Sequence, residues 1–156
     1  MPKNYYLTPK LIKEAKDYFL QKGRSDFLQK RDDSLCGRYL VSREMERLGY
    51  VDFIPEDGVF QCGKYYFSSS HSDDLILIII DTKKCAIDCE KIQSKPIEFY
   101  QTRVSKECLI KFLDLKLDRH EKMTVSLGED MANVSYKGLN YKVKIWEKDG
   151  FVLGII

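Results

Sequence analysis

Two acidic side chains stand two positions apart in the segment Asp88-Cys89-Glu90. The segment has the composition of a short strand, and alternate residues of a strand point to the same face, so we expect both carboxylates to converge. Close carboxylates repel each other unless a cation or a proton lies between them. Oxygen ligands of this kind suit magnesium, which also binds substrate phosphates. Taken alone, the pair favours a plainer interpretation, in which one carboxylate faces solvent near a lysine such as Lys91.

A second pair, Glu107 and Lys111, lies four residues apart on a helix that we expect to run from Lys106 to about Leu115, with Ser105 as its cap. Side chains with this spacing are neighbours on one helix face. Glu107 would also lie in the first turn, where the helix dipole stabilises an anion. Taken alone, the pair indicates a surface ion pair that stabilises the helix by about 0.3 to 0.5 kcal/mol.

A third group of polar side chains spans residues 63–72. Gly63-Lys64 lacks the upstream glycine and the following serine or threonine of a P-loop. Ser70-His71 is not a convincing nucleophile and base, because adjacent residues seldom orient that way and the sequence has no Gly-x-Ser-x-Gly elbow. The hydroxyls and the imidazole could instead donate hydrogen bonds to phosphate oxygens, or form a polar turn between strands.

The helices and strands that position these residues are predicted from helix-capping residues, helix-ending glycines and the period of the apolar residues. Thr8-Pro9 begins a helix and Gly23 ends it, and a second helix is expected from about Ser25 to Leu48. Strands are expected at residues 65–67, 75–80, 86–90, 141–146 and 151–156, with a hairpin turn at Asp149-Gly150. The prediction is one α+β domain over residues 1–156, helical in its first half (about 1–60) and strand-rich in its second (about 61–156).

Composition narrows the function classes. A net charge of +2 is too small to indicate a nucleic-acid or membrane surface. The aliphatic run from Leu75 to Ile80 is too short to cross a bilayer, and the first residues lack the pattern of a secretory signal. The 5 cysteines have no paired Cys-x-x-Cys spacing, which speaks against a disulfide framework and against a structural zinc site. We therefore expect a cytoplasmic protein with reduced thiols, and neither nucleic acid nor membrane as a partner.

Together and in this order, the segments resemble the 4′-phosphopantetheinyl transferase superfamily, particularly its larger type, which activates non-ribosomal peptide synthetases. That family shows a basic helix, then Gly-Lys-Pro, Phe-Asn-x-Ser-His-Ser, Gly-Ile-Asp-Ile-Glu and Trp-(Ser/Thr)-x-Lys-Glu-(Ala/Ser)-x-x-Lys. The counterparts here are Arg31 to Arg38, Gly63-Lys64, Phe67 to Ser72, Ala86 to Glu90 and Lys106 to Lys111. The resemblance extends from roughly residue 24 to the C-terminal strands.

The resemblance implies a fold of two related α/β halves in one compact chain, and a holo-[acyl-carrier-protein] synthase-type enzyme. Such an enzyme transfers 4′-phosphopantetheine from coenzyme A to a serine of an apo acyl or peptidyl carrier protein, depends on Mg2+, and releases 3′,5′-ADP. By resemblance, Asp88, Glu90 and Glu107 hold the Mg2+, Glu107 is also the base, and Lys111 stabilises the departing group. The resemblance assigns the coenzyme A phosphates to Lys30, Arg31, Lys64, Ser70, His71 and Lys106.

The sequence also departs from the family pattern. At the asparagine of the family's His-containing motif this chain has Ser68, and at the glycine before Ile-Asp-x-Glu it has Ala86. At the proline after Gly-Lys it has Tyr65, and at the tryptophan upstream of Lys-Glu it has Arg103. Residues 91–105 alone separate the two acidic motifs, where the larger enzymes carry a longer insert, and the usual N-terminal strand is not expected here. These departures support an alternative function, that of a catalytically impaired relative that binds coenzyme A or a partner protein.

Overall fold

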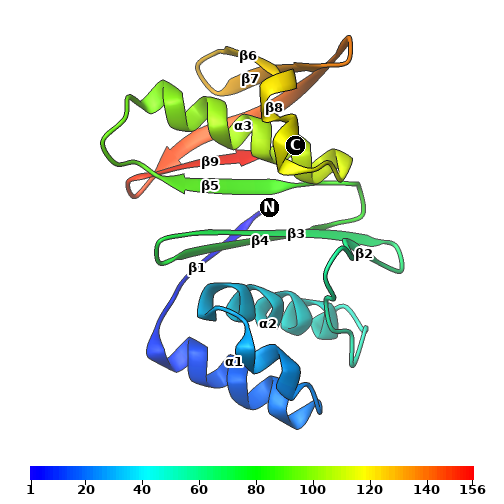
Figure 1. Ribbon diagram of the computed structural model, residues 1–156. Helices are drawn as coiled ribbons and strands as arrows, with labels where there is room; N and C mark the ends of the chain where they lie inside the picture. Colours follow the sequence, from blue (N-terminus) through cyan, green and yellow to red (C-terminus); the bar gives the residue numbers. More distant parts are fainter. The chain divides into compact units, whose positions relative to one another are not determined.

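The structure is a computed structural model that describes residues 1–156, with the side chain of Leu117 excepted. Within these residues it contains both α-helices and two antiparallel sheets, which confirms the α+β class predicted from the sequence. The chain divides into two compact units, Met1–Lys83 and Lys84–Ile156 (Figure 1). Over the described part of the chain, no helix combines the length and the apolar character that a membrane crossing requires.

The first unit packs two helices against a four-stranded sheet with strand order β1-β4-β3-β2. Figure 1 shows α1 and α2 together on one face of this sheet, where Phe19, Leu35 and Met45 form part of the core. In chain order its elements are β1 (Lys3–Tyr6), α1 (Pro9–Gln21), the 3-10 helix η1 (Ser25–Gln29), α2 (Asp32–Arg47), β2 (Gln61–Cys62), β3 (Tyr65–Ser72) and β4 (Leu75–Asp81).

The beginning of α1 follows the sequence signal, because Thr8 accepts a hydrogen bond of 3.1 Å from the backbone N–H of Leu11. The expected single helix from Ser25 to Leu48 is wrong. Lys30 is extended, so the chain forms η1 and then restarts α2 after Arg31, where Asp32 and Asp33 complement the helix dipole. The expected absence of an N-terminal strand is also wrong, since β1 pairs with β4.

The second unit packs one long helix against a five-stranded sheet with strand order β5-β9-β8-β7-β6. Figure 1 shows α3 running across one face of this sheet, where Val104, Cys108 and Val143 are fully buried. Its elements are β5 (Ile87–Lys91), α3 (Ile97–Leu113), the 3-10 helix η2 (Leu117–Lys122), β6 (Thr124–Leu127), β7 (Met131–Tyr136), β8 (Leu139–Lys148) and β9 (Phe151–Ile155).

The hairpin between β8 and β9 confirms the turn predicted at Asp149-Gly150. Both residues have positive φ, 52° and 81°, as the favoured two-residue hairpin turn requires.

The two sheets arrange their strands in the same relation to chain order, which we refer to as the shared connection rule. In each unit the first strand pairs with the last, β1 with β4 and β5 with β9, and the remaining strands follow in reverse chain order.

The helix α3 corrects the sequence prediction for its start. It begins at Ile97, directly after Pro96, so Ser105 is an interior residue rather than a cap. The Ser105 hydroxyl is buried and donates a hydrogen bond of 2.7 Å to the carbonyl of Gln101, four residues earlier. Glu107 therefore lies in the third turn of α3, and the argument that the helix dipole stabilises its charge does not hold.

Gly154 determines how closely α3 approaches the sheet. A Cβ atom at this position would lie 2.6 Å from Cγ1 of Val104 and 3.0 Å from Sγ of Cys108. Both neighbours are fully buried, so neither has room to move aside. Gly154 is the register partner of Asp88, and this glycine therefore brings α3 close to the strand that carries the first acidic motif.

We predict that Gly154→Ala destabilises the protein by about 1 to 3 kcal/mol, because the methyl group overpacks the contact with Val104. Gly37→Ala is the matched control. Gly37 is a helix-interior position whose added Cβ would meet Ser69 at an ordinary 3.7 Å, so we expect stabilisation by about 0.5 to 1 kcal/mol. Urea denaturation of both variants measures the difference, and equal midpoints would contradict the close approach of α3.

Candidate acidic site

The strand β5 presents Asp88 and Glu90 on one face, as the sequence predicts. Asp88 pairs in register with Gly154, whose missing side chain faces α3, so both carboxylates lie on the face that α3 covers. Cys89 between them points to the opposite face. Asp88 is 6% exposed and Glu90 is partly exposed. A buried carboxylate of this kind requires a partner.

The helix α3 presents Arg103, Glu107 and Lys111 toward this face, and their spacing of four residues aligns them along one side of the helix. Lys111 Nζ lies 2.7 Å from Oδ1 of Asp88 and donates a second hydrogen bond of 3.0 Å to the carbonyl of Ile87. Arg103 Nε lies 2.9 Å from Oε1 of Glu90. The carboxylates of β5 are thus paired with cations from α3.

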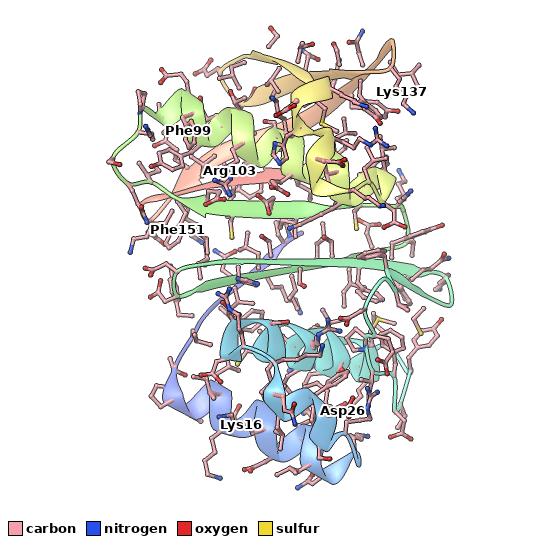
Figure 2. The ribbon with its side chains drawn as sticks, viewed as in Figure 1. Lys16, Asp26, Phe99, Arg103, Lys137 and Phe151 are labelled. Carbon is pink, nitrogen blue, oxygen red and sulfur yellow. The ribbon has the colours of Figure 1, made fainter. Side chains whose placement is uncertain are left out.

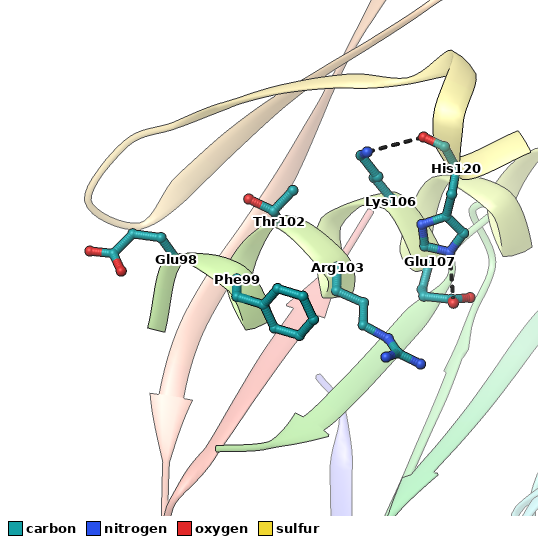
Figure 3. Close-up of a pocket in the computed structure, with 7 residues that line it drawn as sticks. All are labelled: Glu98, Phe99, Thr102, Arg103, Lys106, Glu107 and His120. Carbon is teal, nitrogen blue, oxygen red and sulfur yellow. Dashed lines mark hydrogen bonds and ion pairs between the residues drawn. The ribbon is translucent and has the colours of Figure 1, made fainter. Parts of the chain in front are cut away.

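Glu107 contacts a residue from another element. Its Oε1 lies 2.8 Å from Nε2 of His120 in η2, and Lys106 Nζ donates a hydrogen bond of 3.0 Å to the His120 carbonyl (Figure 3). Two consecutive residues of α3 therefore hold η2 against the helix. We refer to Asp88, Glu90 and Glu107 as the acidic cluster, and to Lys111, Arg103 and His120 as its cation partners, the histidine being a cation only when its ring is protonated.

The electrostatics of Glu90 show that the acidic cluster interacts as a group. Burial raises the pKa of Glu90, and the negative charges of Asp88 and Glu107 raise it further, against the opposing effects of Arg103 and Lys111. Beneath the cluster, burial raises the pKa of Cys108 well above that of a free thiol. This cysteine is therefore an inert part of the core.

A pocket of about 750 Å3 opens beside Glu107, between α3 and η2 (Figure 3). Phe99 and Arg103 project from α3 on the side of the pocket, and Phe99 is 46% exposed (Figure 2). The pocket therefore combines an aromatic surface with charges of both signs, which suits a polar ligand. Its lining consists of Glu98, Phe99, Thr102, Arg103, Lys106, Glu107 and His120.

The chemistry of the acidic cluster suits Mg2+, but its arrangement does not fit a bound ion. Three carboxylates are the hard oxygen donors that Mg2+ prefers. Each of them, however, already contacts a cation partner from its own unit. Among the described residues, no group of three or more histidine, cysteine, aspartate or glutamate side chains is arranged to hold a metal ion. An ion would have to displace the cation partners.

The first unit contains the other residues that the sequence assigns to phosphate binding. Arg31 precedes α2 and lies 2.6 Å from Oδ2 of Asp33, and His71 Nδ1 on β3 lies 3.2 Å from the same oxygen. Asp33, which is buried, thus brings Arg31 and His71 together. Ser70 is also buried and alternates with His71 along β3.

Lys30 and Lys64 lie apart from this group. The ammonium group of Lys30 is 5.3 Å from the ring centroid of Phe27 and 3.6 Å from Asp57. Lys64 precedes β3, whereas His71 is near the far end of the strand, which separates them by roughly 20 Å at the usual rise per residue. Within the first unit, the residues predicted to bind phosphate do not form one cluster.

Sequence reasoning missed Arg103 as a site residue and missed His120 altogether. Arg103 precedes Glu107 by four residues, which places both on one side of a helix. This relation becomes visible only once the helix is extended back to Ile97. His120 follows Glu107 by 13 positions on a separate element, so no local pattern identifies it.

In comparisons with protein-family models and with curated proteins, nothing matches this chain.

We predict unequal coupling energies for the two pairs that join β5 to α3. A double-mutant cycle with Asp88→Asn and Lys111→Met should give about 1 to 3 kcal/mol, because Asp88 is buried. The cycle with Glu90→Gln and Arg103→Gln should give less than about 1 kcal/mol, because water screens this more exposed pair. Chemical denaturation of the variants measures both values, and an equal or reversed order would contradict the assigned burial.

Proposed function

We propose that this protein transfers 4′-phosphopantetheine from coenzyme A to a serine of an apo acyl or peptidyl carrier protein and releases 3′,5′-ADP. The observation that carries this proposal is the facing arrangement of the two acidic motifs. Asp88 and Glu90 of β5 face Glu107 and Lys111 of α3, and Lys111 contacts Asp88 at 2.7 Å. These are the residues that the resemblance to phosphopantetheinyl transferases assigns to the reaction.

The shared connection rule of the two sheets supports the finer fold that this proposal requires. Both units place helices on one face of an antiparallel sheet, and both pair their first strand with their last. This repetition is consistent with two related α/β halves in one chain. The proposal therefore includes a duplicated unit, with one additional strand in the second copy.

In the proposed reaction, the serine Oγ forms a bond to phosphorus while the bond from phosphorus to 3′,5′-ADP breaks. Glu107 accepts the serine proton, and Lys111 stabilises the negative charge on the departing phosphate. Of the residues that the resemblance assigns to the coenzyme A phosphates, Arg31 and His71 are the two that Asp33 brings together, and the proposal assigns a phosphate to this pair. The resemblance assigns Mg2+ to Asp88, Glu90 and Glu107, where it would neutralise charge on the diphosphate only after displacing Lys111, Arg103 and His120.

A second candidate function is a non-catalytic module that binds coenzyme A or a partner protein. The observation that favours it is the pairing of every carboxylate of the acidic cluster with a cation partner. Converging carboxylates are costly when they lack partners, and these have them. Their presence in the chain therefore does not by itself require a metal ion or a reaction.

Intact-mass spectrometry distinguishes the two candidates. A panel of apo acyl and peptidyl carrier proteins is incubated with the protein, coenzyme A and Mg2+. A phosphopantetheine mass shift on a carrier, abolished by a chelator, supports the transferase. Calorimetric binding of coenzyme A without any mass shift supports the binding module. If coenzyme A neither binds nor reacts, the transferase and the coenzyme A-binding form of the second candidate are both wrong.

We predict that Glu107→Gln lowers the rate of transfer by at least about 100-fold, because glutamine cannot accept the serine proton. Glu98→Gln is the matched control, since Glu98 lies on the same helix, lines the same pocket and is exposed. We expect it to retain the rate of the unmodified protein. Circular dichroism checks that both variants are folded, and an undiminished rate in Glu107→Gln would remove the role assigned to this residue.

A further inference from the structure

The pocket between α3 and η2 is formed mostly by one side of α3. Its volume of about 750 Å3 lies within the range of roughly 300 to 1,000 Å3 that is typical of small-molecule sites. His120 of η2 completes the lining and is held there by its contacts with Glu107 and Lys106. The lining residues of α3 form two rows with a spacing of four residues: Phe99, Arg103 and Glu107, and beside them Glu98, Thr102 and Lys106. Side chains within a row are neighbours, so one bound molecule can contact several of them at once.

Arg103 offers this pocket a pair of hydrogen-bond donors. Its side chain is 51% exposed, and it contacts Glu90 through Nε. Within the part of the chain that the structure describes, the two terminal nitrogens of its guanidinium group make no hydrogen bond. These nitrogens form an edge that can bind a carboxylate through two parallel hydrogen bonds. Arg103 can therefore hold Glu90 and the carboxylate of a ligand at the same time.

The charges of the lining favour a ligand with a single negative charge. Lys106 adds a positive charge beside Arg103, because its ammonium group donates its hydrogen bond to a neutral backbone carbonyl, that of His120. Glu98 and Glu107 also line the pocket, and they repel a second negative charge on the ligand. A carboxylate therefore fits this lining better than a phosphate, which carries a charge of about −1.5 to −2 at pH 7.

Phe99 gives the pocket an apolar surface next to these cations. It is 46% exposed and precedes Arg103 by four residues, so the two side chains are neighbours on α3. Figure 3 shows both on the same side of the helix. A planar ring attached to the bound carboxylate can lie against the phenyl group, where aromatic pairs attract each other beyond the burial of their surfaces.

We propose that the pocket between α3 and η2 binds a small carboxylic acid whose body is a planar, apolar ring. The carboxylate accepts hydrogen bonds from the terminal nitrogens of Arg103, and the ring packs on Phe99. The positive charge of Lys106 adds to the attraction. This inference goes beyond the proposed function, because the ligand is neither coenzyme A nor a carrier protein, and its binding requires neither Mg2+ nor a reaction.

Benzoate is the simplest probe of this chemistry. The full chain, isotopically labelled, is titrated with benzoate and followed by two-dimensional amide NMR spectra. We expect saturable shifts of the backbone amides from Glu98 to Glu107 and of His120, with a dissociation constant in the low millimolar range because the probe has few atoms. Benzyl alcohol, which has the ring without the charge, should bind at least about tenfold more weakly. Acetate, which has the charge without the ring, should bind at least about fivefold more weakly.

Variants of the pocket locate the binding. Arg103→Gln should raise the dissociation constant of benzoate at least about tenfold, because hydrogen bonds from a charged donor are lost. Phe99→Leu should raise it about threefold, because the aromatic contact is lost while an apolar side chain remains. Glu98→Gln should lower it by up to about threefold, because a repelling charge is removed. Arg119→Gln is the matched control, since it removes the same charge from η2 outside the pocket lining and should leave the dissociation constant within about twofold.

The inference is wrong if benzoate causes no saturable shifts, or shifts only amides outside the pocket. Equal binding of benzyl alcohol and benzoate, or an unchanged dissociation constant in Arg103→Gln, would also overturn it. Tighter binding of phenyl phosphate than of benzoate would overturn the assigned class, because the site would then select a phosphate. Circular dichroism checks the folding of the variants, and the comparison of probes on the unmodified protein decides the matter if Arg103→Gln does not fold. Transfer from coenzyme A is measured separately, so the failure of either proposal leaves the other intact.

Discussion

The contact between Lys111 and Asp88 is the interaction on which the arrangement of the second unit depends. Asp88 is nearly buried under α3, and an unpaired carboxylate in that position would be costly. Lys111 satisfies it and also bonds the neighbouring backbone carbonyl, which fixes the register of α3 along β5. Helical spacing then places Arg103 opposite Glu90, with Glu107 between, and Gly154 provides the space that this close approach requires.

The sequence predicts the elements whose signals are local. The carboxylates share a face because strands have a period of two, and the turn at Asp149-Gly150 forms because both residues accept positive φ. The start of α3 is not predictable in this way. Residues 97–104 include β-branched and aromatic side chains with low helix propensity, and they become helical because Tyr100 and Val104 pack on the sheet. Similarly, β1 is a strand only through its pairing with β4.

Within the candidate site, the sequence identifies the anions but not their partners. Lys111 contacts an aspartate 23 positions earlier, and Glu107 contacts a histidine 13 positions later. Such pairs arise from the packing of separate elements, so periodicity cannot show them. The same applies to Asp33 in the first unit, which joins Arg31 to His71 and was not singled out from the sequence. Residue types alone therefore identify the charged side chains of a site, but not which side chains they pair with.

The pairing of the first strand with the last in each unit has a consequence for biosynthesis. A chain emerges from the ribosome from its N-terminus, and β1 and β5 each appear well before β4 and β9, the strands with which they pair. Each sheet is therefore completed by a long-range contact, which slows folding relative to a meander of the same length. During that interval the backbone edge of β5 is open to pairing with other chains. Charged residues at Asp88, Glu90 and Lys91 oppose such aggregation in the nascent protein.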